Sequence, residues 1–128
     1  MNMNMMLEYN IGIDIIKVKR VKKKYEHIIK FFSREEIAWC EQSPRKYETA
    51  AGIWASKEAI YKSLSEWDFK IFPQRIKNIE IKYALTGQPK GYLKTEDGQC
   101  IEFAVSITHN KKYAIAVAFH IEGDYEGD

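Results

Sequence analysis

At 128 residues the chain is expected to fold as one domain, residues 1–128, with flexible ends at 1–8 and 121–128. Its composition, 45% hydrophobic and 30% charged with 3 prolines, excludes a disordered or repetitive chain. The net charge is only +2 at pH 7, which excludes a uniformly basic or acidic chain, although the basic residues are unevenly distributed.

The first predicted element is a strand over Tyr9 to Ile15, because apolar and polar residues alternate there with a period of two. Tyr9 and three isoleucines lie on one side of this strand, and Asn10, Gly12 and Asp14 lie on the other. Asp14 therefore points away from the apolar side. An aspartate in this place can serve simply as a cap of the following helix.

A basic segment follows, and its apolar spacing predicts one amphipathic helix from Lys17 to Phe31. Glu26 is the single acidic residue within it. Two interpretations stay open: a solvated helix face, or a surface for an acidic partner or a phosphate. The basic residues of this segment are Lys17, Lys19, Arg20, Lys22, Lys23, Lys24 and Lys30.

Two helix starts come next. Ser33 to Glu36 has the S-x-x-E form of a capping box, in which serine and glutamate satisfy each other's backbone amides. Ser43-Pro44 repeats a start signal and predicts a long helix from Arg45 to about Ser65.

The second half of the chain has the pattern of strands joined by tight turns. The turns are Thr86 to Pro89, Asp97-Gly98 and the polar tip Thr108 to Lys111. We expect an α+β fold in which an antiparallel sheet, joined by the first strand, packs against helices. The predicted strands are Ile76 to Ala84, Gly91 to Lys94, Ile101 to Ile107 and Lys112 to Phe119.

Three short segments carry reactive residue types: 12–14, 54–62 and 106–109. Glu58 and Lys62 lie one helical turn apart, in the order that favours a surface ion pair worth about 0.3–0.5 kcal/mol. Alternatively, Asp14 and Glu58 approach each other and hold a hard cation, with Lys62 as a nearby positive charge. Magnesium suits two carboxylates because it keeps several waters and substrate phosphates. His109 lies in a predicted turn, where a lone histidine is more often a hydrogen-bonding residue than a catalyst.

Other features narrow the class of protein. Cys40 and Cys100 lie far apart without a histidine pair, which argues against zinc and redox sites and favours a reducing, cytoplasmic location. The longest apolar run, 114–119, is too short to cross a bilayer, and the first ten residues lack a signal-peptide pattern.

Taken together and in order, these motifs resemble the holo-acyl-carrier-protein synthase family of phosphopantetheinyl transferases. The resemblance covers roughly Ile11 to Phe119. It is carried by Gly12-Ile13-Asp14 with Arg20, Phe32-Ser33-Arg34-Glu35-Glu36, Trp54-Ala55-Ser56-Lys57-Glu58-Ala59 with Lys62, Gly87-Gln88-Pro89, and Ser106-Ile107-Thr108-His109.

The resemblance implies transfer of phosphopantetheine from coenzyme A to a serine of an acyl carrier protein. It implies Mg²⁺ bound by Asp14 and Glu58, and catalysis by Glu58 and Lys62, with Glu58 or a metal-bound water as candidate base. It also implies a homotrimer with coenzyme A between neighbouring chains. The implied coenzyme A contacts are Lys62, Gly87, Pro89, Thr108 and His109, and the implied contacts to the acidic carrier are Arg20, Lys23 and Lys24.

Three departures from the family pattern leave other functions possible. Ile53 stands where many relatives carry arginine, the segment 63–67 lacks a glycine-rich loop, and the stretch between Arg20 and Ser33 is short. One alternative is a transferase dedicated to a secondary-metabolism carrier. Another is a non-catalytic relative that binds coenzyme A or a carrier. A nucleic-acid-binding protein is the least favoured, because its aromatic residues are placed as core residues and are not interleaved with the basic ones.

Overall fold

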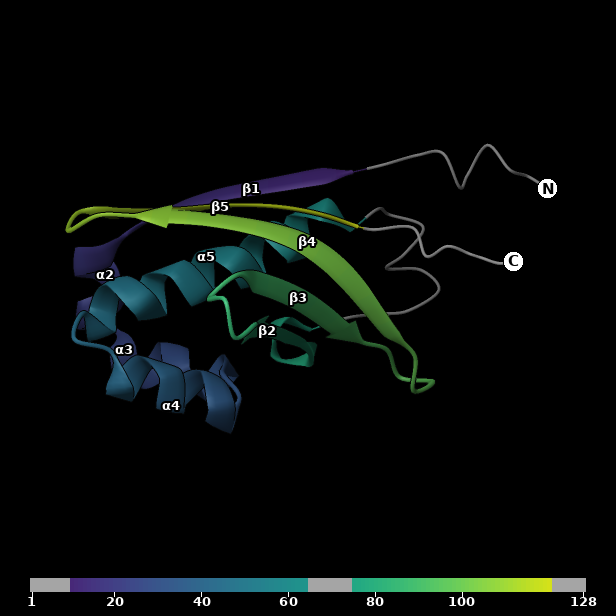
Figure 1. The fold of residues 1–128 in the computed structure, drawn as a ribbon, viewed down its shortest axis with the longest axis horizontal. Helices are drawn as coiled ribbons and strands as arrows, with labels where there is room; N and C mark the ends of the chain where they lie inside the picture. Colours follow the sequence, from purple (N-terminus) through teal and green to yellow (C-terminus); the bar gives the residue numbers. More distant parts are fainter. Residues whose placement is uncertain (1–9, 65–74, 121–128) are drawn as a thin grey trace.

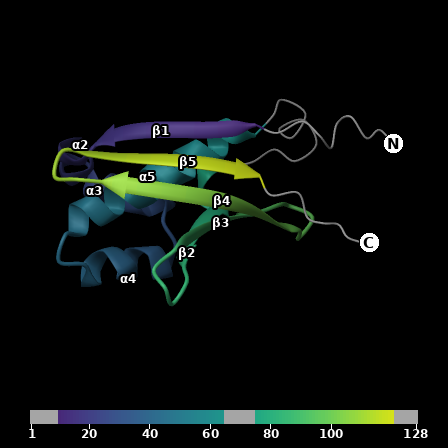
Figure 2. The same cartoon turned by 45° about the horizontal axis from the view of Figure 1, so that its top comes forward.

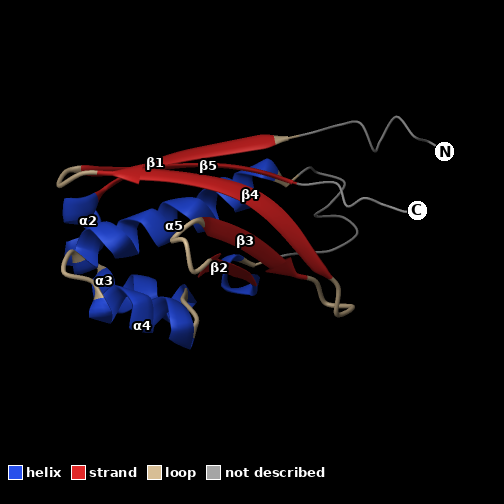
Figure 3. Cartoon of the chain, in the orientation of Figure 1, coloured by secondary structure: helices blue, strands red, loops and turns tan. Residues whose placement is uncertain are grey.

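The structure is a computed structural model that describes residues 10–64 and 75–120. Within these residues, five antiparallel strands form one sheet in the order β1-β5-β4-β3-β2, and the helices lie on one side of it (Figures 1 and 3). The predicted α+β fold, with the first strand in the sheet, is thus confirmed. The strands are β1 (Ile11–Lys17), β2 (Ile79–Tyr83), β3 (Pro89–Lys94), β4 (Cys100–His109) and β5 (Tyr113–His120). The helices are α2 (Val18–Lys23), α3 (Tyr25–Ile28), α4 (Arg34–Gln42) and α5 (Lys46–Ser63), with short 3-10 turns η1 (Ile29–Phe31) and η2 (Ile76–Asn78).

Helix α5 is the centre of the core and packs closely against β1 and β5. Its buried alanines face the buried alanines of β5, so the helix and the sheet approach each other closely. The approach is tightest at Gly12, where an added Cβ would lie 1.7 Å from the carbonyl oxygen of Ala59. Glycine is therefore required at this position of β1, and the contact brings Asp14 beside the last turns of α5.

The alternation predicted for the first strand is confirmed over Ile11–Lys17, but its isoleucines do not face the core. Ile11, Ile13 and Ile15 are 68%, 60% and 59% exposed, whereas Gly12 is buried. No described helix covers this side of the sheet, as Figure 2 shows. We call this surface the open sheet face. It consists of three residues of β1 and four of β5, namely Ile11, Ile13, Ile15, Tyr113, Ile115, Val117 and Phe119.

The single helix predicted for the basic segment is wrong. Lys17 ends β1, α2 ends at Lys23, and Lys24 interrupts the helix with φ −113° and ψ 23°. The break accompanies the burial of Tyr25, whose hydroxyl donates to Glu41 of α4 at 2.8 Å. The predicted apolar positions still face the core after the break, because Tyr25 and Ile28 of α3 are buried.

The capping box at the start of α4 is confirmed. Ser33 Oγ accepts from the Glu36 amide at 3.1 Å, and Glu36 Oε1 accepts from the Ser33 amide at 2.8 Å. The long helix begins slightly later than predicted: α5 begins at Lys46, and Ser43 Oγ accepts from the Arg45 amide in the preceding turn.

The strands of the second half are confirmed with shifted ends. Residues 76–78 form η2 and not the start of a strand, while Thr108 and His109 belong to β4 and not to a turn. Gly87 and Gly98 have φ of +89°, which is the left-handed conformation that these turns require of glycine. Tyr9, the predicted flexible ends and most of the segment 63–67 lie outside the described residues.

Candidate active site

The structure brings three predicted residues, Asp14, Glu58 and Lys62, to one cleft. Lys62 Nζ lies 2.7 Å from Asp14 Oδ1 and 3.4 Å from the carbonyl oxygen of Ile13. Glu58 lies one helical turn before Lys62 on α5, and all three line a cleft of about 840 Å³. Two elements distant in sequence, β1 and α5, therefore supply two carboxylates and one amine to the same space.

The three charged side chains of this cleft differ in their partners: Lys62 forms an ion pair with Asp14, and Glu58 lies near both. Burial, together with the nearby carboxylate of Asp14, raises the pKa of Glu58, while Lys62 acts in the opposite direction. The hydrogen bond to Asp14 raises the pKa of Lys62, so this amine is positively charged at neutral pH. Among the described residues, none donates a hydrogen bond to the Glu58 carboxylate. A cation between Asp14 and Glu58 would relieve their repulsion.

The oxygen donors of this cleft fit magnesium, which commonly takes one or two protein carboxylates and completes its shell with water and phosphate. Residues 10–64 and 75–120 contain no cluster of three or more histidine, cysteine, aspartate or glutamate side chains, which zinc would favour. The predicted pair Asp14 and Glu58 is thus the donor set that this cleft offers to a hard cation.

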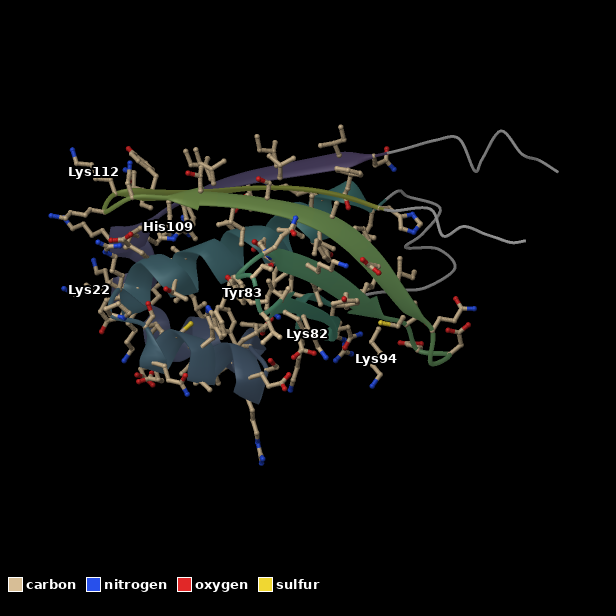
Figure 4. All side chains as sticks on the ribbon, viewed as in Figure 1. Lys22, Lys82, Tyr83, Lys94, His109 and Lys112 are labelled. Carbon is tan, nitrogen blue, oxygen red and sulfur yellow. The ribbon has the colours of Figure 1, made fainter. Side chains whose placement is uncertain are left out.

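Basic residues line the same cleft. Arg20 and Lys24 lie on its wall, together with Lys17 and His27. Lys23 lines a neighbouring hollow of about 550 Å³ next to Lys22, which Figure 4 shows at the end of the molecule. Of the predicted docking residues, Arg20 and Lys24 thus line the carboxylate cleft, and Lys23 lines the hollow beside it.

The remaining predicted residues gather elsewhere. Gly87, Pro89 and His109 line a separate pocket of about 210 Å³, and His109 Nδ1 lies 2.9 Å from Glu48 Oε1. Thr108 is exposed and lines neither space. Within one chain, the residues predicted to hold coenzyme A are therefore divided: Lys62 lines the carboxylate cleft, and Gly87, Pro89 and His109 line the second pocket.

The sequence analysis did not predict the buried ion pair between Glu36 and Lys57. Lys57 Nζ lies 2.9 Å from Glu36 Oε1, and both side chains are at most 1% exposed. Glu36 also accepts from the Ile81 amide at 2.7 Å, and Lys57 donates to the carbonyl of Ile79. The signal was present in the sequence, since Lys57 shares a helical face with the apolar Ile53 and Ile60.

Ile53, which stands where many relatives carry arginine, is fully buried in the core. The side chain therefore contributes to packing and offers no contact to an anion. No described helix is long and apolar enough to cross a membrane.

The amino-acid sequence and the fold of this chain are both similar to those of one family of known proteins. A sequence model of the 4'-phosphopantetheinyl transferase superfamily matches residues 10–118. The holo-[acyl-carrier-protein] synthase of Mycoplasma capricolum subsp. capricolum is 39% identical over 111 residues, covering 85% of this chain and 91% of that protein. That of Caldicellulosiruptor bescii is 38% identical over 120 residues, covering 86% and 95%.

Solved structures of such synthases share the fold. The Bacillus anthracis protein, crystallised in complex with CoA (3',5'-ADP), superposes with a TM-score of 0.68 at 25% identity, covering 87% of this chain and 94% of that one. The Helicobacter pylori protein in complex with coenzyme A gives a TM-score of 0.67 at 27% identity, covering 87% and 99%.

Proposed function

This chain belongs to the 4'-phosphopantetheinyl transferase superfamily, and from that membership we propose that it transfers 4'-phosphopantetheine from coenzyme A to a serine of an apo acyl carrier protein. The observation that carries the proposal is the convergence of Asp14, Glu58 and Lys62 in one cleft. The reaction serves fatty acid synthesis or a related carrier-dependent pathway. The relatives are named holo-[acyl-carrier-protein] synthases, and similar structures include complexes with coenzyme A.

The reaction needs positive charge where negative charge develops. Asp14 and Glu58 would hold Mg²⁺, which when bound neutralises charge on the pyrophosphate of coenzyme A. Lys62 is charged and half exposed, so it can exchange Asp14 for a phosphate oxygen. Removing one such group typically costs about 3–4 kcal/mol of barrier.

The chemical step exchanges one phosphorus–oxygen bond for another. The serine oxygen of the carrier attacks the β-phosphorus, the bond to the bridging oxygen breaks, and adenosine 3',5'-bisphosphate leaves. The serine proton must be accepted by a base, and Glu58, which lines this cleft, or a metal-bound water would be the candidate. The product is a phosphodiester on the carrier.

We propose that the complete site forms between neighbouring chains of a homotrimer. The open sheet face supports this, because a large exposed apolar patch on a small protein commonly marks an interface between chains. Thr108, which pairs with Ile115, lies at the end of β4 on this face, whereas His109 pairs with the buried Ala114 and lies on the side of the helices. Association would let the pocket of Gly87, Pro89 and His109 on one chain adjoin the carboxylate cleft of the next.

The acidic carrier protein would dock on Arg20, Lys23 and Lys24. These side chains are exposed and flank the cleft, so they can steer an acidic partner toward the reacting groups. The docking should weaken as salt is added. Cys40 and Cys100 are free thiols, which supports a reducing cytoplasmic location.

The direct test of the activity is the intact mass of several apo carrier proteins after incubation with this protein and coenzyme A, with magnesium or with EDTA. We expect a magnesium-dependent gain of one phosphopantetheine, and the carriers that react identify the pathway served. Coenzyme A binding without any mass gain would favour the non-catalytic alternative.

The shared site has its own test, in which two inactive variants are mixed. Glu58→Ala removes a ligand from the cleft, and His109→Ala removes a residue from the second pocket. If sites form between chains, random reassembly should recover about one quarter of wild-type activity, since that fraction of sites has both intact halves. No recovery would place the whole site within one chain.

A further inference from the structure

The pocket formed by Gly87, Pro89 and His109 has an aromatic wall that the family motifs do not include. Trp39 of α4 and Tyr83 of β2 both line it. Their rings stack face to face, with centroids 4.6 Å apart and planes inclined by only 2°. Figure 4 labels Tyr83 and His109, which come from different strands of the sheet.

The stack is held in place by the buried ion pair beside it. Glu36 of α4 accepts from the Ile81 amide of β2 at 2.7 Å and is paired with Lys57. Trp39 lies one turn after Glu36, and Tyr83 lies two residues after Ile81 on the same side of β2. The anchored helix and strand therefore fix the two rings in a preorganised arrangement.

One side of this aromatic pair is available to a ligand. Trp39 is 46% exposed although one face of its indole is covered by Tyr83. Among the described residues, no further ring stacks on it. The pocket also offers polar groups, namely the His109 ring and the turn at Gly87, beside which there is open space. Flat aromatic surface next to polar groups suits a nucleobase.

We propose that Trp39, supported by Tyr83, is the stacking platform for the adenine ring of coenzyme A. The inference rests on the proposed function, since it assigns the nucleotide half of that co-substrate to this pocket. It makes Trp39 a specificity-determining residue that contributes to affinity for the nucleotide and leaves the transfer step unchanged.

The test compares coenzyme A binding by titration calorimetry in Trp39→Leu, Trp39→Phe and the wild type. Leucine keeps apolar volume but loses the ring face, so we expect roughly tenfold weaker binding, whereas phenylalanine should keep most of the affinity. Leu85→Ala is the matched control, because Leu85 is a fully exposed apolar residue on the neighbouring turn and lies outside the pocket lining. Its affinity should equal that of the wild type.

Two further measurements separate the possible outcomes. 4'-Phosphopantetheine lacks the base, so its affinity should be the same in Trp39→Leu and the wild type. The transfer rate at saturating coenzyme A should also be unchanged in Trp39→Leu, whereas failure of the proposed function would appear as absence of transfer by the wild type.

The proposal is overturned if Trp39→Leu binds coenzyme A as tightly as the wild type, or if it loses its assembly state, which would place Trp39 in a contact between chains. Should Trp39→Leu not fold, tryptophan fluorescence decides. Coenzyme A should quench the wild type more than Trp39→Phe, and equal quenching would contradict stacking on Trp39.

Discussion

Helix α5 carries two lysine–carboxylate pairs that have similar geometry and opposite surroundings. Lys57 lies 2.9 Å from Glu36, with both side chains at most 1% exposed. Lys62 lies 2.7 Å from Asp14, yet its own side chain is 53% exposed. One pair is enclosed by the core and the other opens into the cleft, so the same chemical groups serve folding in one place and reactivity in the other.

The buried pair is costly to form and costly to break. Burial raises the pKa of Glu36 and lowers the pKa of Lys57, so the surroundings oppose both charges. The pair persists because its remaining polar atoms are satisfied by the backbone of Ile79, Ile81 and Ser33. Loss of one partner would leave the other charge buried and unpaired.

The open pair has no such constraint. Lys62 reaches solvent and lies near Glu58, a carboxylate without a hydrogen-bond donor among the described residues. An exposed pair of this kind contributes at most about 1 kcal/mol to stability, so its lysine is free to leave Asp14 for a phosphate. We therefore expect Lys57 to affect the stability of the fold and Lys62 to affect the rate of transfer.

The largest effect is expected from Lys57→Met, which leaves Glu36 as an unpaired buried carboxylate. The free energy of unfolding should fall by about 3–5 kcal/mol, as measured by urea denaturation. Lys62→Met is the matched control and should change it by no more than about 1 kcal/mol. Equal losses in both variants would contradict the division between the two pairs.

The buried pair offers a second comparison within the same experiment. The double variant Glu36→Met with Lys57→Met removes both charges, so it should lose clearly less stability than the sum of the two single variants. An additive loss would mean that the two side chains act independently.

The next largest effect is expected in the kinetics of transfer, when Lys62 of the exposed pair with Asp14 is replaced. Lys62→Met should lower kcat/KM for transfer by about 10²–10³-fold, which corresponds to about 3–4 kcal/mol of barrier. Lys90→Met is the control, because Lys90 forms another exposed pair, 3.3 Å from Glu102, away from the cleft. A wild-type rate in Lys62→Met would remove this lysine from the chemistry.

The smallest effect is the pH dependence of stability due to Glu58. Its pKa is raised in the folded protein, so its ionisation opposes folding. Without magnesium, the stability of the wild type relative to Glu58→Gln should therefore be greatest at low pH and fall as pH rises through the raised pKa. Urea denaturation at several pH values measures this difference, and a rise with pH would contradict the assigned direction.

Much of the fold was predictable from local patterns. The capping box at Ser33, the glycine turns and the alternating strands each depend on neighbouring residues, and each is found in the structure. The position of Asp14 was also predictable, since strand alternation alone separates it from the isoleucines of β1.

The predictions that were wrong concern features that depend on distant parts of the chain. The isoleucines of β1 have a core-like pattern but are exposed, because no described helix covers that face. The helix break at Lys24 follows from burial of Tyr25, whose hydroxyl donates to Glu41 on another helix at 2.8 Å. The separation of His109 from Asp14 into two spaces is likewise a property of the assembled sheet.

The measurement that most directly tests the assignment of the cleft is single-turnover transfer to an apo carrier by Glu58→Gln, with its unfolding curve recorded on the same sample. We predict at least about a 100-fold slower transfer, with a free energy of unfolding no lower than that of the wild type. Transfer at the wild-type rate by this folded variant would contradict the proposal that Asp14, Glu58 and Lys62 carry the chemistry.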